Sequence, residues 1–395
     1  MRPRALGALL GLVACEPRVV APEPEPRAFA GLDASTADVA RPSVAEERPF
    51  TVAPPLRFTV ERGAAKVTPL PFTSSSGATF GPDGRTFVVD VIEPHRTGAL
   101  VVSPSNPSGA FFATREVHDV RFSPSGRRVL VLDDETRTVT VLSVPDGQVL
   151  ASARPAWVAR FRGEEFVPFW DGCKVMELAV ATGATRPVSS PECGGASASD
   201  DGRTFVVASP SRTGVTLERT PYQRLSFVDA ETGAADVIAE SPAGDVTSIR
   251  LAPSGTVVCF DEHGFRCRRR GASAPLVVPP GASTSLVFSD DGTKMLYRSS
   301  GALVVADFAA RTATELDLAA LASPELRHFD FFPSGTRIIV YQAGAWACDL
   351  RTAVCLEIVP TSVEPGGFAP SNDRTFLLGI EAGATRRFSK VELAR

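Results

Sequence analysis

Short β-rich runs recur along most of the chain, and each follows a tight-turn signal. One example is Phe80-Gly81-Pro82-Asp83-Gly84, which precedes the run Thr86-Phe87-Val88-Val89-Asp90. Proline presets φ, aspartate supplies a side-chain acceptor, and glycine accepts the left-handed position that such a turn needs. The run after the turn is rich in the β-branched and aromatic residues that favour strands. The pattern predicts an all-β chain built from repeated hairpins.

The turn unit recurs at nearly constant intervals. Measured between the turn residues, the spacings are 42, 37, 39, 53, 37, 43 and 37 residues. A period near 40 residues is typical of the four-stranded blades of a β-propeller. The sequence therefore predicts a β-propeller over residues 56–395 with eight blades, or with seven if one copy forms no blade. The turn residues are Gly84, Gly126, Gly163, Gly202, Gly255, Gly292, Gly335 and Asn372.

The repeats resemble the WD40-like repeats of TolB-type periplasmic β-propellers. The resemblance rests on copies such as Phe122-Ser123-Pro124-Ser125-Gly126 and covers residues 72–395. It implies a propeller fold. The chain departs from true WD40 repeats, because Trp170-Asp171 is expected to end a second strand and no Gly-His pair occurs. The partners of WD40 proteins are therefore not transferred to this chain.

The last repeat ends after its third predicted strand, near residues 384–395. A propeller blade needs a fourth strand, and an earlier segment can supply it. The two candidates are Arg57-Phe58-Thr59-Val60 and Lys66-Val67-Thr68-Pro69-Leu70. Either would close the ring and leave no open sheet edge at the seam.

The amino terminus has the features of an export signal. Arg2 and Arg4 precede an apolar stretch from Ala5 to Ala14, which is too short to span a bilayer. Leu12-Val13-Ala14-Cys15 resembles the lipobox of bacterial lipoproteins. The resemblance implies that residues 1–14 are a signal peptide and that Cys15 carries a lipid; the alternative is an ordinary signal peptide with a chance cysteine. We therefore expect a cell-envelope protein, anchored by lipid to a membrane and facing the periplasm or the cell surface.

Residues 15–55 are expected to form a tether. Residues 16–55 contain eight prolines, interleaved with acidic residues such as Glu23 and Glu25. Such a segment buries too little apolar surface to offset its loss of conformational entropy. Proline-rich chains favour an extended conformation, so the segment would space the propeller from its anchor.

The six cysteines other than Cys15 fall into near pairs. In an exported protein an even number of cysteines favours disulfides. Each pair lies within one predicted blade, where cross-strand neighbours come close enough for a disulfide. Free thiols and a metal site are the alternatives, and the metal is disfavoured because no Cys-x-x-Cys spacing occurs. The expected pairs are Cys173 with Cys193, Cys259 with Cys267, and Cys348 with Cys355.

Charge and composition narrow the classes of function. The chain has 41 Lys+Arg against 45 Asp+Glu, a formal net charge of −4. This balance argues against a nucleic-acid binder, which normally carries a basic surface. No motif of a serine hydrolase, zinc protease or nucleotide-binding enzyme occurs, and no cofactor or metal is expected. If the chain is an enzyme, the candidate acid–base pairs are His118 with Asp119 and His328 with Asp330.

The inner strand of each repeat has one apolar face and one small or polar face. Alternation with a period of two places these side chains on opposite sides of the strand. The apolar face is expected to pack between blades, and the polar face to line the central channel. Converging guanidinium groups suit a carboxylate or phosphate, although they can also pair with acids of the channel wall. The candidate basic residues are Arg121, Arg160 and Arg250, with Asp119, His328 and Asp330 expected opposite them.

The spacing of 53 residues indicates an insertion around residues 209–224. Long loops often carry function, and tyrosine and arginine are typical interface anchors, although the insertion can also be merely tolerated. The candidate partner-binding residues are Arg212, Arg219, Tyr222 and Arg224.

Together these features predict a lipid-anchored, monomeric envelope propeller. Its expected role is a non-catalytic binding or assembly scaffold for a protein or a small anionic ligand, because propellers present large rigid loop surfaces. The alternatives are a hydrolase or lyase acting at the channel mouth, and a structural protein without a ligand.

Overall fold

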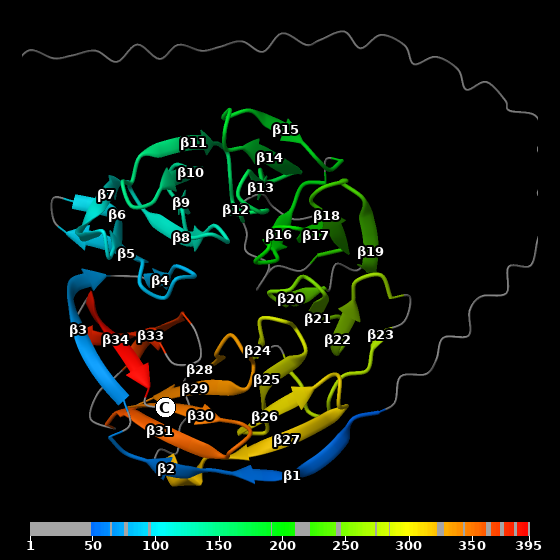
Figure 1. The fold of residues 1–395 in the computed structure, drawn as a ribbon. Coiled ribbons are helices and arrows are strands. Elements are labelled where there is room, and N and C mark those ends of the chain that lie inside the picture. Colours follow the sequence, from blue (N-terminus) through cyan, green and yellow to red (C-terminus); the bar gives the residue numbers. More distant parts are fainter. Residues whose placement is uncertain are drawn as a thin grey trace, which may run out of the picture. The chain divides into compact units, whose positions relative to one another are not determined.

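Eight sheets follow one another around a ring in the computed structural model of the chain (Figure 1). The structure therefore confirms an all-β propeller with eight blades. The residues that the structure describes are 49–63, 65–74, 78–93, 96–190, 192–209, 222–241, 246–272, 275–283, 285–321, 328–342, 344–360, 365–371, 375–382 and 385–393.

The first four blades each contain four consecutive strands, numbered from the channel outward. Blade 1 comprises β4 (Ala78–Phe80), β5 (Phe87–Glu93), β6 (Arg96–Ser103) and β7 (Asn106–Ala113). Blade 2 comprises β8 (Val117–Phe122), β9 (Arg128–Asp133), β10 (Thr138–Ser143) and β11 (Val149–Ala153). Blade 3 comprises β12 (Val158–Ala159), β13 (Phe166–Trp170), β14 (Val175–Ala179) and β15 (Thr185–Pro187). Blade 4 comprises β16 (Gly195–Ala198), β17 (Thr204–Ser209), β18 (Arg224–Asp229) and β19 (Ala235–Glu240).

The last four blades follow the same order, and blade 8 lacks an outer strand of its own. Blade 5 comprises β20 (Thr247–Leu251), β21 (Val257–Asp261), β22 (Phe265–Arg269) and β23 (Pro275–Leu276). Blade 6 comprises β24 (Leu286–Phe288), β25 (Lys294–Ser299), β26 (Ala302–Asp307) and β27 (Thr312–Asp317), and a 3-10 helix η1 (Ala319–Leu321) follows it. Blade 7 comprises β28 (His328–Phe331), β29 (Arg337–Gln342), β30 (Gly344–Asp349) and β31 (Val354–Val359). Blade 8 contains β32 (Pro365–Pro370), β33 (Thr375–Ala382) and β34 (Thr385–Leu393).

An N-terminal strand closes the ring at blade 8, as the second of the two candidate segments predicted. Strand β3 (Ala65–Ser74) pairs antiparallel with β34, with Val67 opposite Val391 (Figure 1). Val67 packs against the core cluster that contains Val391 and the almost fully buried Phe376. The third and the last strands of the described chain are thus held in one sheet.

The other candidate segment adds strands elsewhere. β1 (Thr51–Arg57) and β2 (Thr59–Glu61) pair in parallel with β27 and β31, as fifth strands of blades 6 and 7. Between them Phe58 is 5% exposed and joins the core shared by these two blades. β1 begins at Thr51, within residues 15–55 that were expected to be tether, so strand structure starts before residue 56. Its prolines are tolerated because β1 is an edge strand and its register is interrupted between Ala53 and Leu56.

The core lies between neighbouring blades. Ile249 of the inner strand of blade 5 packs with Val206 and Phe227 of blade 4. Phe331 of blade 7 packs in the same way with Leu296 of blade 6. Ile249 and Phe331 are each 3% exposed, which confirms that the apolar face of the inner strands packs between blades.

The turns after the inner strands also pack blade against blade. Gly202 has φ +66°, and a Cβ atom there would lie 2.5 Å from the carbonyl oxygen of Phe161 in blade 3. Gly255 has φ +70°, and a Cβ atom there would lie 2.8 Å from the side chain of Thr204 in blade 4. Glycine is required at these positions by both the left-handed φ and the close approach of the neighbouring blade.

All three expected disulfides are present, each within one blade. Cys173 is bonded to Cys193, 20 residues later. Cys259 lies directly opposite Cys267 on strands β21 and β22, and Cys348 lies opposite Cys355 on β30 and β31. In the described part of the chain, no helix is long and apolar enough to cross a membrane.

The closing strand gives a test of the seam. Truncation of the chain through residue 74 removes β3 and opens blade 8, whereas truncation through residue 64 removes only β1 and β2. We expect the longer truncation to lower the melting temperature by on the order of 10 °C more than the shorter one, because it exposes the apolar face that Val67 covers. Calorimetry on both truncated chains measures the difference, and equal melting temperatures would contradict the assignment of the seam.

Candidate functional site

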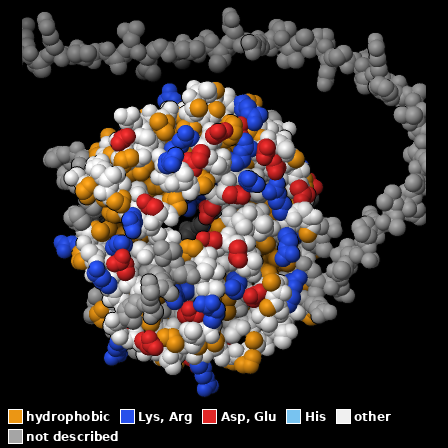
Figure 2. Space-filling view, in the orientation of Figure 1, with side chains coloured by type: hydrophobic (Ala, Val, Ile, Leu, Met, Phe, Trp, Pro, Cys, Tyr) orange, Lys and Arg blue, Asp and Glu red, His pale blue; other side chains and the backbone are white. Residues whose placement is uncertain are grey.

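The inner strands of the blades surround the axis of the ring (Figure 1). The space-filling view shows an opening at the centre of this face, bordered by both acidic and basic side chains (Figure 2). Asp119 and Arg121 lie on β8, Arg160 follows β12 directly, and Asp200 lies in the turn after β16. Three consecutive blades therefore bring two acids and two arginines together.

We call these four residues the Arg–Asp cluster. The carboxylate of Asp119 accepts hydrogen bonds from Nε of Arg121 at 3.1 Å and from Nη1 of Arg160 at 2.5 Å. Oδ1 of Asp200 lies 3.7 Å from Nη1 of Arg121 and 3.6 Å from Nε of Arg160. Asp119 thus bridges the two guanidinium groups closely, and Asp200 approaches both without a hydrogen bond.

Electrostatics keep Asp119 and Arg121 ionised. Burial alone raises the pKa of Asp119, but the charges of Arg160 and Arg121 and the hydrogen bond from Arg160 outweigh it, so that this pKa lies below its ordinary value. Burial alone lowers the pKa of Arg121, and Asp119 and Asp200 outweigh it in the opposite direction. The cluster carries two positive and two negative charges at neutral pH.

This arrangement differs from the expected one in the position of Asp119 and in the residues that join the cluster. Asp119 was expected opposite the arginines across the channel, but it lies beside them, because Arg121 is on the same strand and Arg160 is on the next blade. Arg250 lies on β20, and its Nη1 donates to the carbonyl oxygen of Ile249 at 3.4 Å.

His328 and Asp330 lie apart from the cluster, on strand β28 of blade 7. Burial, with a smaller contribution from the charge of Asp290, raises the pKa of Asp330 to about 6, although a hydrogen bond from the backbone N–H of Phe331 opposes the shift. The ring of His328 stacks on Tyr341 with centroids 5.0 Å apart. This part of the ring therefore carries an acid that is easily protonated, unlike Asp119.

Neither of the two candidate acid–base pairs is joined by a hydrogen bond in the described part of the chain. Nδ1 of His118 lies 3.9 Å from Asp134, and a register shift between Val117 and Asp119 falls at this histidine. Among the described residues no hydrogen bond joins His118 to Asp119 or His328 to Asp330. Nor do the described residues contain a group of three histidine, cysteine or acidic side chains suited to a metal ion.

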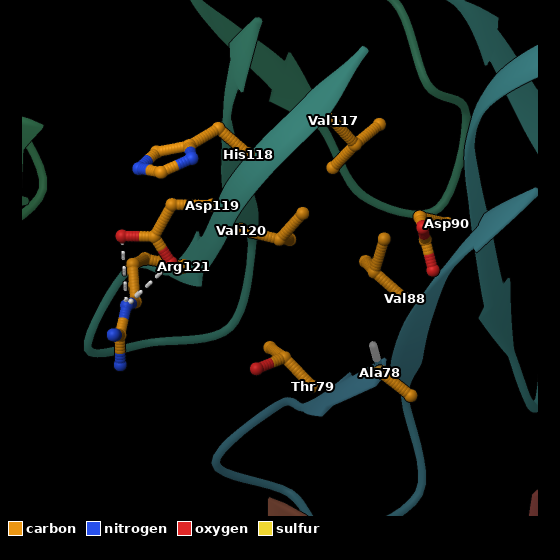
Figure 3. A pocket seen from close by; sticks show the side chains of 9 residues that line it. All are labelled: Ala78, Thr79, Val88, Asp90, Val117, His118, Asp119, Val120 and Arg121. Carbon is orange, nitrogen blue, oxygen red and sulfur yellow. Dashed lines mark hydrogen bonds and ion pairs between the residues drawn. The ribbon is translucent and has the colours of Figure 1, made fainter. Parts of the chain in front are cut away.

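A cavity of about 210 Å³ lies beside the cluster, between the inner strands of blades 1 and 2 (Figure 3). Figure 3 shows Asp119 and Arg121 at one side of the cavity and Asp90 at the other, with Val88 and Val120 between them. Asp90 is only 3% exposed. The cavity thus combines an apolar wall with charged groups at two edges. The lining residues are Ala78, Thr79, Val88, Asp90, Val117, His118, Asp119, Val120 and Arg121.

The insertion in blade 4 is only partly described. Arg212 and Arg219 lie outside the described residues. Tyr222 is fully buried in the core between blades 4 and 5, so in this structure it has no exposed surface to offer a partner. Nε of Arg224 lies 3.7 Å from Glu192, and the Arg224 side chain is 42% exposed.

Asp200 and Asp290 were missed as site residues, although the sequence contains a signal for them. Most copies of the repeat have proline in the turn, whereas the copies at Gly202 and Gly292 have Ser-Asp-Asp-Gly. The first aspartate of each such turn faces a charged inner-strand residue of another blade. Asp200 approaches Arg121 and Arg160, and Asp290 raises the pKa of Asp330.

Comparison with solved structures supports the fold. An oligogalacturonate lyase in complex with manganese is 12% identical, with a TM-score of 0.52; the match covers 84% of this chain and 91% of that one. A eukaryotic initiation factor is 12% identical, with a TM-score of 0.53, over 80% of this chain and 85% of that one. At this identity the likeness shows a β-propeller and nothing finer. No protein-family model and no curated protein matches the sequence.

The unequal burial of the two arginines gives a stability test. The Arg160 side chain is 12% exposed and that of Arg121 is 40% exposed. We expect Arg160→Ala to lower the free energy of unfolding by about 3 kcal/mol, because it removes the closest counter-charge of Asp119. Arg121→Ala should cost about 1 kcal/mol. Urea denaturation compares the variants, and equal losses would contradict the assigned role of Arg160. The double variant Asp119→Ala, Arg160→Ala should lose less than the sum of the single changes.

The raised pKa of Asp330 predicts a pH-dependent stability difference. Between the unfolded pKa near 4 and the folded pKa of about 6, the folded state binds more protons, so this group destabilises the fold as pH rises. We expect Asp330→Asn to be more stable than the wild type above pH 6, by at most about 3 kcal/mol. Below about pH 4 the difference should vanish. Melting curves across this range measure it, and a constant difference would contradict the assignment.

Proposed function

We propose that this chain is a lipid-anchored β-propeller of the cell envelope that binds a small amphipathic ligand with an anionic group at its central channel. The ligand is bound without chemical conversion. The observation that carries the proposal is the position of Arg121. Its side chain borders the cavity beside the valine wall and also belongs to the Arg–Asp cluster.

The shape and lining of the cavity support a small ligand. Ligand sites are usually concave and mostly apolar, with a few polar groups that fix orientation. Val88, Val117 and Val120 supply the apolar wall, and Thr79 and Arg121 supply polar groups at its edge. A cavity of about 210 Å³ corresponds to roughly seven water volumes, enough for a ring or short alkyl chain. The anionic group would then reach Arg121.

The proposed location in the cell envelope is supported by the N-terminal sequence and by the disulfides. The lipobox resemblance at Cys15 and the predicted tether lie outside the described residues, except for the last part of the tether segment. Three disulfides support an oxidising compartment, because such bonds are rare in the cytosol.

A protein partner is a second kind of ligand within the same scaffold role. Arg212 and Arg219 in the insertion remain candidates for it, and the half-exposed Arg224 lies at the end of the same insertion. Tyr222 is withdrawn from this set because it is buried.

The enzymatic alternative is a hydrolase or lyase, and one observation favours it. Asp330 has a pKa of about 6, which suits a general acid or base near neutral pH. The fold likeness to a protein named as an oligogalacturonate lyase is compatible with this role. Release of phenol from phenyl phosphate would favour a hydrolase over a binding protein, because this probe has a hydrolysable ester bond.

Aromatic probes test the proposed site. Benzoate and phenyl phosphate combine a ring with an anionic group, and benzyl alcohol lacks the charge. We expect one or both anions to raise the melting temperature of the wild type by a few degrees, with no effect of benzyl alcohol at the same concentration. Arg121→Ala should abolish the shift.

Arg127→Ala is the matched control. Arg127 is exposed on the same blade, and its replacement changes the net charge equally. It should leave the shift intact. A shift that survives in Arg121→Ala, or that disappears in both variants, would place binding elsewhere and overturn the proposed site.

A further inference from the structure

One nitrogen of the Arg–Asp cluster is buried without a hydrogen-bond partner. Nε of Arg160 is inaccessible to solvent, and no acceptor within the described residues is bonded to it. The nearest carboxylate oxygen, Oδ1 of Asp200, lies 3.6 Å away, beyond hydrogen-bond distance. A buried charged donor without an acceptor is rare and costly. Its direction therefore marks a place where an acceptor is expected.

Asp200 occupies that place only loosely. Its side chain is 52% exposed and lies at 3.6 and 3.7 Å from the two guanidinium groups. Asp119, by contrast, is hydrogen-bonded to both arginines. The backbone of Asp200 is fixed, because its N–H donates to the carbonyl oxygen of Pro253 at 2.8 Å. Rotation of the side chain alone would therefore vacate the space between Arg121 and Arg160.

We propose that the space between Arg121 and Arg160 receives the carboxylate of the ligand. In the absence of ligand the side-chain carboxylate of Asp200 occupies this space, and the ligand displaces it. Asp200 is thereby a specificity-determining residue. This inference rests on the proposed function, since it names the anionic group and the residue that competes with it.

Charge balance favours a carboxylate over a phosphate. With Asp200 in place the cluster contains two arginines and two aspartates and is neutral. When Asp200 turns away, two arginines face Asp119 alone, so the cluster has a net charge of +1. A carboxylate carries one negative charge and restores neutrality, whereas a phosphate monoester carries more than one at pH 7. A carboxylate can also accept from Nη1 of Arg121 and Nε of Arg160, one through each oxygen.

The test compares two neighbouring aspartates. In Asp200→Asn the competing charge is removed, and we expect the dissociation constant of benzoate to fall by roughly three- to tenfold. Asp201→Asn is the matched control, because it changes the same charge in the same turn. The side chain of Asp201 accepts instead from the Ser199 hydroxyl at 2.6 Å and the Arg203 N–H at 3.0 Å. Its benzoate affinity should equal that of the wild type. Calorimetric titration measures all three proteins.

A third variant examines the unpaired nitrogen. Arg160→Lys keeps the positive charge near Asp119 but removes Nε. In the Asp200→Asn background this change should cancel the gain in benzoate affinity. A circular-dichroism melt confirms that each variant is folded before titration.

The outcomes separate the inference from the proposed function. If benzoate binds the wild type through Arg121 but Asp200→Asn leaves its affinity unchanged, the inference fails and the proposed function stands. A gain for phenyl phosphate without one for benzoate overturns the carboxylate assignment. An equal gain in Asp201→Asn shows a general charge effect and also overturns it. Benzoate that binds neither the wild type nor Asp200→Asn overturns the inference as stated.

Discussion

The ring depends on the contact between successive turns around its channel. In blades 2, 4, 5, 6 and 7 the turn glycine has a positive φ, and a Cβ atom there would press on the preceding blade. At Gly335 that Cβ atom would lie 2.9 Å from the side chain of Ser289, in the equivalent turn of blade 6. Because each of these five turns packs against the turn before it, the spacing of the neighbouring inner strands is fixed at these positions. The repeat glycine thus serves both the local turn and the geometry of the site.

The charge states of the acidic side chains on the inner rim differ between one side of the ring and the other. Blades 2 to 4 contribute a compact set of neutralised charges, in which Asp119 is held ionised by Arg160 and Arg121. Blade 7 contributes Asp330, whose burial favours the protonated form, with Asp290 of blade 6 adding to the effect. Acids of the same residue type thus differ in charge state around one ring because their neighbours differ. A ligand entering the channel would meet fixed charge on one arc and titratable charge on the other.

Local pattern was sufficient to predict much of the fold. The count of repeats favoured eight blades over seven, and near pairs of cysteines within single repeats predicted the three disulfides. The strand missing from the last repeat indicated two candidate closing segments, of which the one in β3 closes the ring. The site was predicted less completely. Arg121, Arg160 and Asp119 were identified from the period-two alternation of inner strands, but their mutual pairing depends on the stagger between blades, which a single sequence does not encode locally. Asp200 was missed because it reaches the arginines from a turn, and the burial of Tyr222 depends on contacts with blade 5.

The N-terminal segment lies on three successive blades, as β1 on blade 6, β2 on blade 7 and β3 on blade 8. This order has a mechanical consequence for a chain pulled from its amino terminus. Tension applied at Thr51 first loads the pairing of β1 with β27, and only after β1 and β2 have detached does it reach the strand that closes the ring. β1 and β2 would therefore detach one after the other before the pairing of β3 with β34 is loaded. The chain would lengthen under tension while blade 8 keeps its four strands.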